Sequence, residues 1–399
     1  MAIPELHAAC KSGNVKQVKA LLENPSTKIN KTTRRGRTPL FYAAVSGHTE
    51  VIQLLLKKKC VSINHADDER ATPLLVAAQN GHQEVVEALL REEGILLNEA
   101  DKFGQTPLFL AAGKGHQKAV LALIGNKNVA VNQGNNYNVT PLFIAAQNGH
   151  EKVVKLLLSR EDVEVNKSRD DGCTPLIIAS QNDHKKVVEV FLEDDRIDVN
   201  RADEEGGTPL SKSAYKGHKM VVRMLLDKAG ILVNSASNNG TTPLWKAAMN
   251  GQEHVVELLL GKMNILVNLP SNKGVTPISI AAFEGHDKVV KILLRKADIQ
   301  VNAADMFGCV PLSYAAQYGH VKVVELLLNK DGIQVNMADW TGATPLSRAA
   351  ENRHGKIVEM LLRKSDNRAL GWTGWRPHRR IGAPPQLPVG HDGPRSVMK

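Results

Sequence analysis

Histidine is the residue whose spacing in this chain most suggests chemistry. Nine histidines recur in register, with 34 residues or a multiple of 34 between them: His48, His82, His116, His150, His184, His218, His286, His320 and His354. Such a ladder could hold metal ions, but packed helices lie about 8–10 Å apart, whereas imidazoles that share zinc each need a bond of about 2.0–2.1 Å. We therefore expect no metal site. Each neutral ring is expected to bond a turn carbonyl at the start of the helix that follows it.

Other catalytic patterns fail on spacing as well. His150 and Glu151 begin a string like the H-E-x-x-H zinc motif, but Val154 occupies the position of the second ligand. No glycine loop for phosphate is present, and Ser, His, Asp and Cys residues are dispersed without a supporting motif. We predict no catalytic residue, no cofactor and no enzyme activity.

The cysteines and the apolar segments bear on the compartment. Cys10, Cys60, Cys173 and Cys309 are far apart, without a C-x-x-C pair. The N-terminal residues do not form a secretory signal, and no apolar stretch approaches the length of a membrane span. The sequence predicts free thiols in a cytoplasmic or nuclear protein, which we expect to act as a monomer.

The charge is concentrated at one end of the chain. The formal net charge is +10, and residues 367–399 carry six basic residues against Asp392, which gives +5. These basic residues are Arg368, Arg376, Arg379, Arg380, Arg395 and Lys399. The remainder is only mildly basic, which argues against a dedicated nucleic-acid surface.

These residues are positioned by an internal repeat. Thr-Pro-Leu or a close variant recurs every 34 residues, at Thr38, Thr72, Thr106, Thr140, Thr174, Thr208, Thr242, Thr276, Val310 and Thr344. An apolar residue followed by Asn keeps the same period from Asn30 to Asn336. Two markers in phase, without a gap, predict a stack of identical structural units.

The residues of one unit predict two helices and a turn. The Thr hydroxyl can cap a helix whose first residue is the Pro. This helix passes through a small pair such as Ala43-Ala44 and ends near a left-handed glycine such as Gly47, which Asp183 and Arg353 replace in two units. The second helix is too apolar to have one face in water, and a D-x-x-G stretch then predicts a tight hairpin.

The segment TPLFIAAQNGHEKVVKLLL followed by VEVN resembles the ankyrin repeat, in ten successive units that span roughly residues 3–366. The unit is one residue longer than usual, and the histidine common after Thr-Pro-Leu is absent. The resemblance implies an all-α repeat solenoid, a curved rod of stacked helix-turn-helix units with short β-hairpins. The AAQNGH and LLL segments are similar to ankyrin arrays of fungal multidomain proteins, including those with NACHT-type switches.

The two ends differ from the middle. Residues 1–36 are expected to form a degenerate capping repeat, because Gln17 and Ala20 replace apolar residues of the second helix. Residues 37–366 hold the ten repeats, and residues 367–399 form a basic Pro- and Gly-rich segment that we expect to be disordered. Leu370, Trp372 and Trp375 could cover the last helix, or the segment could reflect an altered reading frame, which we favour.

Variation between units lies at the hairpin tips and on exposed positions of the first helices, which the resemblance assigns to a concave recognition surface. The charged candidates are Arg34, Arg35, Arg37, Asp68, Glu69, Asp170, Asp171, Glu204 and Glu205. The aromatic candidates are Phe103, Tyr137, Tyr215, Phe283, Phe307, Tyr318 and Trp340. Aromatic residues interleaved with charges along about 100 Å of stacked units favour a protein or extended-peptide partner.

The sequence thus predicts a non-catalytic scaffold or recognition module for a protein or peptide. One alternative is a regulatory or ligand-sensing fragment of a larger signalling receptor. Another is a binder of nucleic acid or acidic surfaces that acts through the basic tail, whose affinity would fall steeply with salt.

Overall fold

The computed structural model describes residues 4–364, and these form 22 helices in eleven pairs. The first pair is α1 Glu5–Ser12 and α2 Val15–Glu23. Repeats 1 to 5 comprise α3 Pro39–Ser46, α4 Thr49–Leu56, α5 Pro73–Gln79, α6 Gln83–Leu90, α7 Pro107–Lys114, α8 Gln117–Ile124, α9 Pro141–Gln147, α10 Glu151–Leu158, α11 Pro175–Gln181 and α12 Lys185–Glu193. Repeats 6 to 10 comprise α13 Pro209–Lys216, α14 Lys219–Asp227, α15 Pro243–Met249, α16 Glu253–Leu260, α17 Pro277–Glu284, α18 Asp287–Leu293, α19 Pro311–Gln317, α20 Val321–Leu328, α21 Pro345–Glu351 and α22 Gly355–Lys364.

The first helices of repeats 1 to 10 begin and end as the sequence predicts, except that α19 follows Val310 and has no side-chain cap. In α3, the hydroxyl of Thr38 accepts a hydrogen bond from the backbone N–H of Phe41 at 3.2 Å. Gly47 ends this helix at φ 75°, a left-handed conformation that glycine adopts without steric cost. Asp183 and Arg353, which replace that glycine elsewhere, keep the same conformation at φ 59° and 60°. The backbone geometry of the repeat therefore overrides the local preference of these two side chains.

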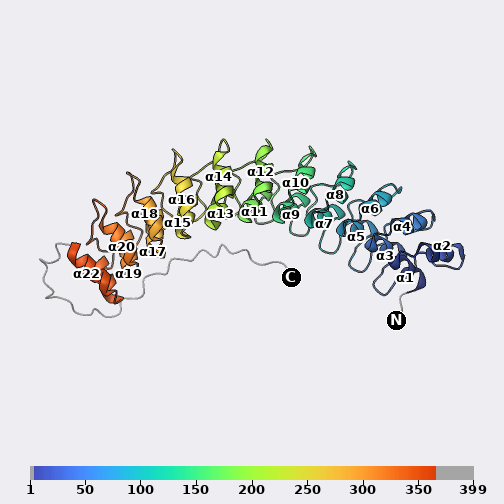
Figure 1. Ribbon diagram of the computed structural model, residues 1–399, viewed down its shortest axis with the longest axis horizontal. Coiled ribbons are helices and arrows are strands. Elements are labelled where there is room, and N and C mark those ends of the chain that lie inside the picture. Colours follow the sequence, from blue (N-terminus) through green and yellow to red (C-terminus); the bar gives the residue numbers. More distant parts are fainter. Residues whose placement is uncertain (1–3, 365–399) are drawn as a thin grey trace.

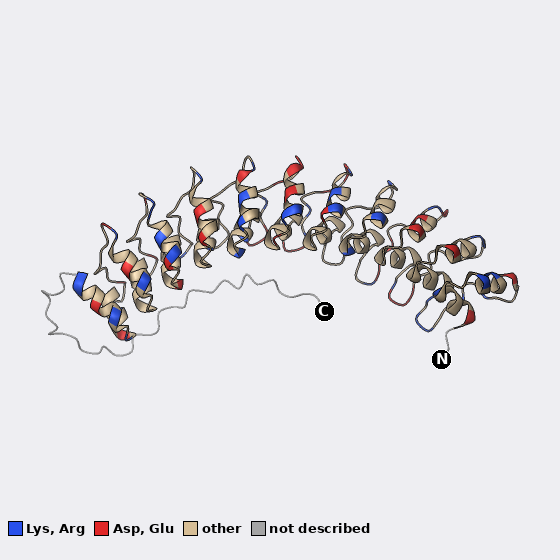
Figure 2. Cartoon of the chain, viewed as in Figure 1, with Lys and Arg blue, Asp and Glu red and all other residues tan. Residues whose placement is uncertain are grey.

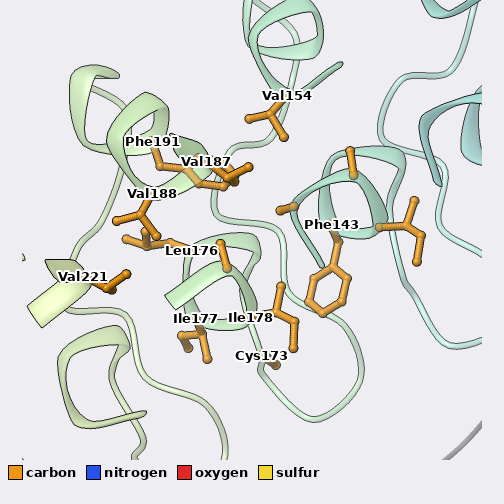
Figure 3. Packing of buried hydrophobic residues seen from close by; sticks show 14 of the residues in the cluster. Phe143, Val154, Cys173, Leu176, Ile177, Ile178, Val187, Val188, Phe191 and Val221 are labelled. Carbon is orange, nitrogen blue, oxygen red and sulfur yellow. The ribbon is translucent and has the colours of Figure 1, made fainter. Parts of the chain in front are cut away.

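The helix pairs stack side by side into a curved array (Figure 1). The first helices lie on the inner side of the curve and the second helices on the outer side. Each interior repeat buries apolar residues against both neighbours, as the packing of Phe143, Leu176, Val187 and Phe191 shows in Figure 3. The core is therefore continuous along the stack, with small Ala pairs that bring neighbouring first helices close together.

The histidine ladder joins neighbouring repeats. Nε2 of His82 donates to the carbonyl oxygen of Val45 at 2.9 Å, and the same bond, 37 residues back in sequence, recurs from His48 to His354. The predicted carbonyl acceptor is thus present, but its predicted position at the start of the following helix is wrong. Carbonyls left without a partner lie at the C-terminal end of a helix, and the ring reaches one in the preceding repeat.

Repeat 7 departs from this ladder, because Gln252 replaces the histidine. Its side chain occupies the place over Gly217 where the other repeats put an imidazole over a glycine such as Gly47. Within residues 4–364, however, the Gln252 side chain makes no hydrogen bond to the preceding repeat. The junction between repeats 6 and 7 therefore lacks one bond that its neighbours have.

The Asn marker forms a second ladder at the opposite end of the helix pairs. The side-chain amide of Asn64 donates to Gly94 O at 2.8 Å, and its oxygen accepts from Leu96 N at 3.0 Å. The same pair of bonds recurs from Asn30 to Asn302. This explains the constant spacing of Asn in the sequence, since one side chain satisfies both backbone groups of the next loop.

The predicted β-hairpins are present as turns, without strands among the described residues. Asp67 Oδ1 accepts from the backbone N–H groups of Glu69 and Ala71, which closes the tip. A single backbone bond, such as Asp68 N to Arg35 O at 3.1 Å, joins one tip to the next. One bond per junction is too few for a strand ladder. The Asp carboxylate, rather than strand pairing, holds each such tip closed.

The N-terminal helix pair has a polar outer flank. In α2 only Val18 is fully buried, and Ala20 is exposed while Gln17 is half-buried. At the other end, α22 buries Ile357 and Leu361. Residues 367–399, with Leu370, Trp372 and Trp375, lie outside the described residues.

No helix in residues 4–364 combines the length and the apolar character that crossing a bilayer requires.

Candidate functional site

The inner face of the curve consists of the first helices and the turn tips that precede them. Figure 2 shows that the second helices carry most of the charged helical residues, whereas most first helices are largely uncharged. The inner face therefore has its charges mainly at the tips, with small and apolar residues behind them. This is the surface on which the candidate residues were placed.

The structure puts most candidates in solvent. The exposed candidates are Arg34, Arg35, Asp68, Glu69, Phe103, Tyr137, Asp170, Asp171, Glu204, Glu205, Tyr318 and Trp340. Arg37, Tyr215, Phe283 and Phe307 are half-buried. Trp340 has 78% of its surface exposed and lies against Gly308 of the preceding tip. These residues project outward from the stack, but they are spread along it and do not converge on one pocket.

Several acidic tips are neutralised within the chain. Glu69 pairs with Lys102 of the next tip. Asp171 pairs with Arg169 at 2.6 Å, and Glu205 lies 3.5 Å from Lys212. The acidic patches that the sequence suggested are therefore weaker than the residue types alone indicate.

Several aromatic rings of repeats 1 to 6 also have a cation of this chain beside them. The charged groups of Arg37, Lys102, Arg169 and Lys216 lie 5.0, 5.1, 5.4 and 5.6 Å from the ring centroids of Phe41, Phe103, Phe143 and Tyr215, respectively. A cation within about 6 Å of a ring centroid is attracted by the ring face. In repeats 1 to 6, cations of this chain thus already contact several of the aromatic rings that a bound partner could otherwise use.

Repeats 8 and 9 hold an aromatic cluster of a different kind. The ring of Phe283 lies 4.6 Å from Tyr318 and 5.5 Å from Tyr314, edge to face in both cases. Tyr318 is 41% exposed and Phe283 is half-buried. No lysine or arginine of residues 4–364 lies over any of these rings.

Two buried carboxylates support this cluster from behind. Asp305 accepts a hydrogen bond from the Tyr314 hydroxyl, and burial followed by this bond raises the pKa of Tyr314. Asp339 accepts from Nε of Arg348 at 3.1 Å. Burial pushes the pKa of Asp339 upward, but hydrogen bonds from Thr341 and Arg348 outweigh it, so that the pKa lies below its usual range. Asp305 and Asp339 therefore have structural roles.

The comparison with family models agrees with this geometry. A model for ankyrin repeats, three copies long, matches residues 6–101, 94–169, 158–236, 230–305 and 300–369. The chain belongs to the ankyrin-repeat family. Ankyrin repeats are generally protein-interaction modules. Among curated proteins, none matches this chain.

Within these ankyrin repeats the cysteines are free thiols. Burial raises the pKa of Cys10, Cys173 and Cys309 to about 12, whereas Cys60 is exposed. No group of three or more His, Cys, Asp or Glu in the described part of the chain could hold a metal ion.

Sequence reasoning missed the buried partners of the ankyrin surface. Phe41 and Phe143 lie beside Arg37 and Arg169, and Lys102 and Arg169 pair with Glu69 and Asp171; the sequence predicts none of these contacts. Glu284, which follows Phe283, was also missed. The sequence shows that acidic and basic residues occur at the tips, but it identifies a pair such as Glu69 and Lys102 only when the register of stacking is known.

Proposed function

We propose that the turn tips and the exposed positions of the first helices form a non-catalytic binding surface for a protein or an extended peptide. The observation that supports this proposal is the exposure of large aromatic side chains at positions that the framework does not use. Trp340, Tyr137 and Phe103 are 78%, 57% and 53% exposed. Aromatic side chains of this kind dominate the free energy of many protein interfaces.

The separation of framework residues from variable tip residues within each repeat supports the same proposal. The Thr caps, the His ladder and the Asn ladder fix the backbone, so tip residues can vary without loss of the fold. The surface is long and shallow, which suits an extended segment better than a small molecule.

The test is affinity capture of binding proteins by the full chain and by a variant with Phe103, Tyr137, Phe307 and Trp340 all changed to Ala. A matched control changes four exposed leucines outside the tips, Leu96, Leu121, Leu232 and Leu266, to Ala. We expect the tip variant to lose partners that the control retains. Equal capture by the two variants would show that the surface lies elsewhere.

A further inference from the structure

A recurring arrangement of three groups appears on the inner face of repeats 1 to 5. In it, a cation lies beside an aromatic ring and also pairs with a carboxylate. Arg37 lies over Phe41 and 2.9 Å from Asp67. Lys102 lies over Phe103 and pairs with Glu69. Arg169 lies over Phe143 and 2.6 Å from Asp171.

Repeats 8 and 9 have two of the three groups and lack the third. Phe283 and Tyr318 supply the rings, 4.6 Å apart. Glu284 supplies a carboxylate next to Phe283 in the chain. Among residues 4–364, no lysine or arginine pairs with this carboxylate or lies over these rings.

Glu284 lies within electrostatic range of the rings. Burial is the main reason that the pKa of the Tyr318 phenol is raised; the neighbouring Cys309 and Glu284 add to it, and the charge of Arg348, which is paired with Asp339, opposes it. Burial also raises the pKa of Glu284 itself, and the charges of His286 and His320 only partly offset this rise. Both histidines donate from Nε2 to carbonyl oxygens of the preceding repeat. Glu284 as a residue is nevertheless exposed, and no lysine or arginine among residues 4–364 pairs with it.

We infer that the surface formed by Phe283, Glu284 and Tyr318 binds an arginine or lysine side chain of the partner peptide. The guest cation makes the two kinds of contact, to a ring and to a carboxylate, that Arg37, Lys102 and Arg169 make internally. Those three residues precede the N-terminal ends of first helices, whereas Phe283, Glu284 and Tyr318 lie at the C-terminal ends of α17 and α19. The guest cation gains attraction to a ring face and to a carboxylate that has no cation of residues 4–364 beside it.

This inference rests on the proposed function, since it names the chemistry of one part of the same surface. The probes are fluorescein-labelled nonapeptide pools whose central residue is fixed as Arg, citrulline, Lys or norleucine. The other positions are randomised without Arg, Lys or Cys. Citrulline keeps the shape of Arg without its charge, and norleucine keeps the alkyl chain of Lys. Binding to the full chain is measured by fluorescence polarisation at pH 7.5.

We expect the Arg and Lys pools to bind about fivefold more tightly than the citrulline and norleucine pools. Glu284→Gln and Tyr318→Leu should each remove most of this preference. Glu204→Gln, which removes an equal charge from an exposed tip of repeat 6, should leave it unchanged. Circular dichroism and thermal unfolding check that each variant keeps the fold.

Equal binding of charged and neutral pools, or equal loss in the Glu204 and Glu284 variants, would overturn the inference. The two proposals fail in different ways. If the full chain shows no preference for charged peptides but the four-tip variant still loses its partners, only the inferred cation site is contradicted. A preserved charge preference with unchanged partner capture would instead contradict the proposed function.

Discussion

Repeats 1 to 6 and repeats 8 to 10 share one framework but differ in how their inner faces are completed. In the first region, Arg37, Lys102 and Arg169 each pair with a carboxylate and cover a ring. In the second, Phe283 and Tyr318 pack on each other, and the adjacent Glu284 pairs with no lysine or arginine among residues 4–364. The difference shows that the same stacking geometry is compatible with two kinds of surface. In one, charged residues pair within the chain; in the other, a carboxylate is left for a bound molecule to pair with.

The largest expected effect concerns one ion pair of each region whose carboxylate is buried. Asp339 and Arg348 are 2% and 10% exposed at their side chains, whereas Asp67 and Arg37 are 1% and 29% exposed. Arg348→Met should lower the free energy of unfolding by about 2–4 kcal/mol, because it leaves a buried carboxylate without its cation. Arg37→Met should cost about 1 kcal/mol, since water reaches that pair. Urea unfolding measures both, and equal losses would contradict the contrast.

The junction between the two regions gives a second test. His218 donates from Nε2 to Gln181 O at 2.9 Å, and Gln252 makes no such bond. Gln252→His should raise the free energy of unfolding by about 1 kcal/mol, and His218→Gln should lower it by a similar amount. Thermal and urea unfolding report the change. If both substitutions act in the same direction, the ladder does not stabilise the stack as described.

The third test uses pH, because the pKa values of one carboxylate from each region, Asp171 and Glu284, are shifted in opposite directions. Burial raises the pKa of Asp171, but the hydrogen bond from Arg169 and further backbone bonds outweigh it and lower the pKa overall. Its stabilisation is present above the unfolded pKa and is lost as pH falls through the lower folded pKa. Burial raises the pKa of Glu284, so its ionised form destabilises the fold at neutral pH and protonation relieves this cost.

At pH 7, Asp171→Asn should therefore destabilise the protein, and Glu284→Gln should stabilise it by a few tenths of a kcal/mol, roughly, after solvent screening. Both effects should shrink near pH 3.5. Chemical unfolding at the two pH values checks the signs, and a destabilising Glu284→Gln at pH 7 would show that the carboxylate has a partner.

The smallest expected change in stability comes from opening an internal site in the first region. Lys102→Met frees Glu69 and the ring of Phe103 at a cost of about 0–1 kcal/mol, because the pair is exposed. Binding is compared in the Glu284→Gln background, which removes the proposed site of repeats 8 and 9. In that background, the added Lys102→Met substitution should create a preference for the Arg pool over the citrulline pool that Glu284→Gln alone does not show. No gain in the double variant would mean that a ring and a carboxylate are insufficient.

The tertiary structure corrected the sequence-based picture at particular residues. Thr38 and Gly47 behave as their local preferences predict, because capping and left-handed geometry depend on neighbours in the chain. Arg70 and Asn138 are left-handed at φ 63° and 56° because they occupy the turn position that glycines such as Gly104 hold in other repeats. The acceptor of His82 lies 37 residues earlier in the sequence, where only the register of stacking brings it within reach.

The sequence by itself determined the period, the two helices of each unit and the variable tips, because caps, apolar spacing and turn residues act over a few residues. Only the tertiary structure decided which charge meets which, since Lys102 and Glu69 belong to different repeats and their pairing depends on the approach of neighbouring tips. The same approach leaves Glu284 without a counter-charge in residues 4–364. Local interactions are encoded within one unit, whereas electrostatic pairing is a property of the stack.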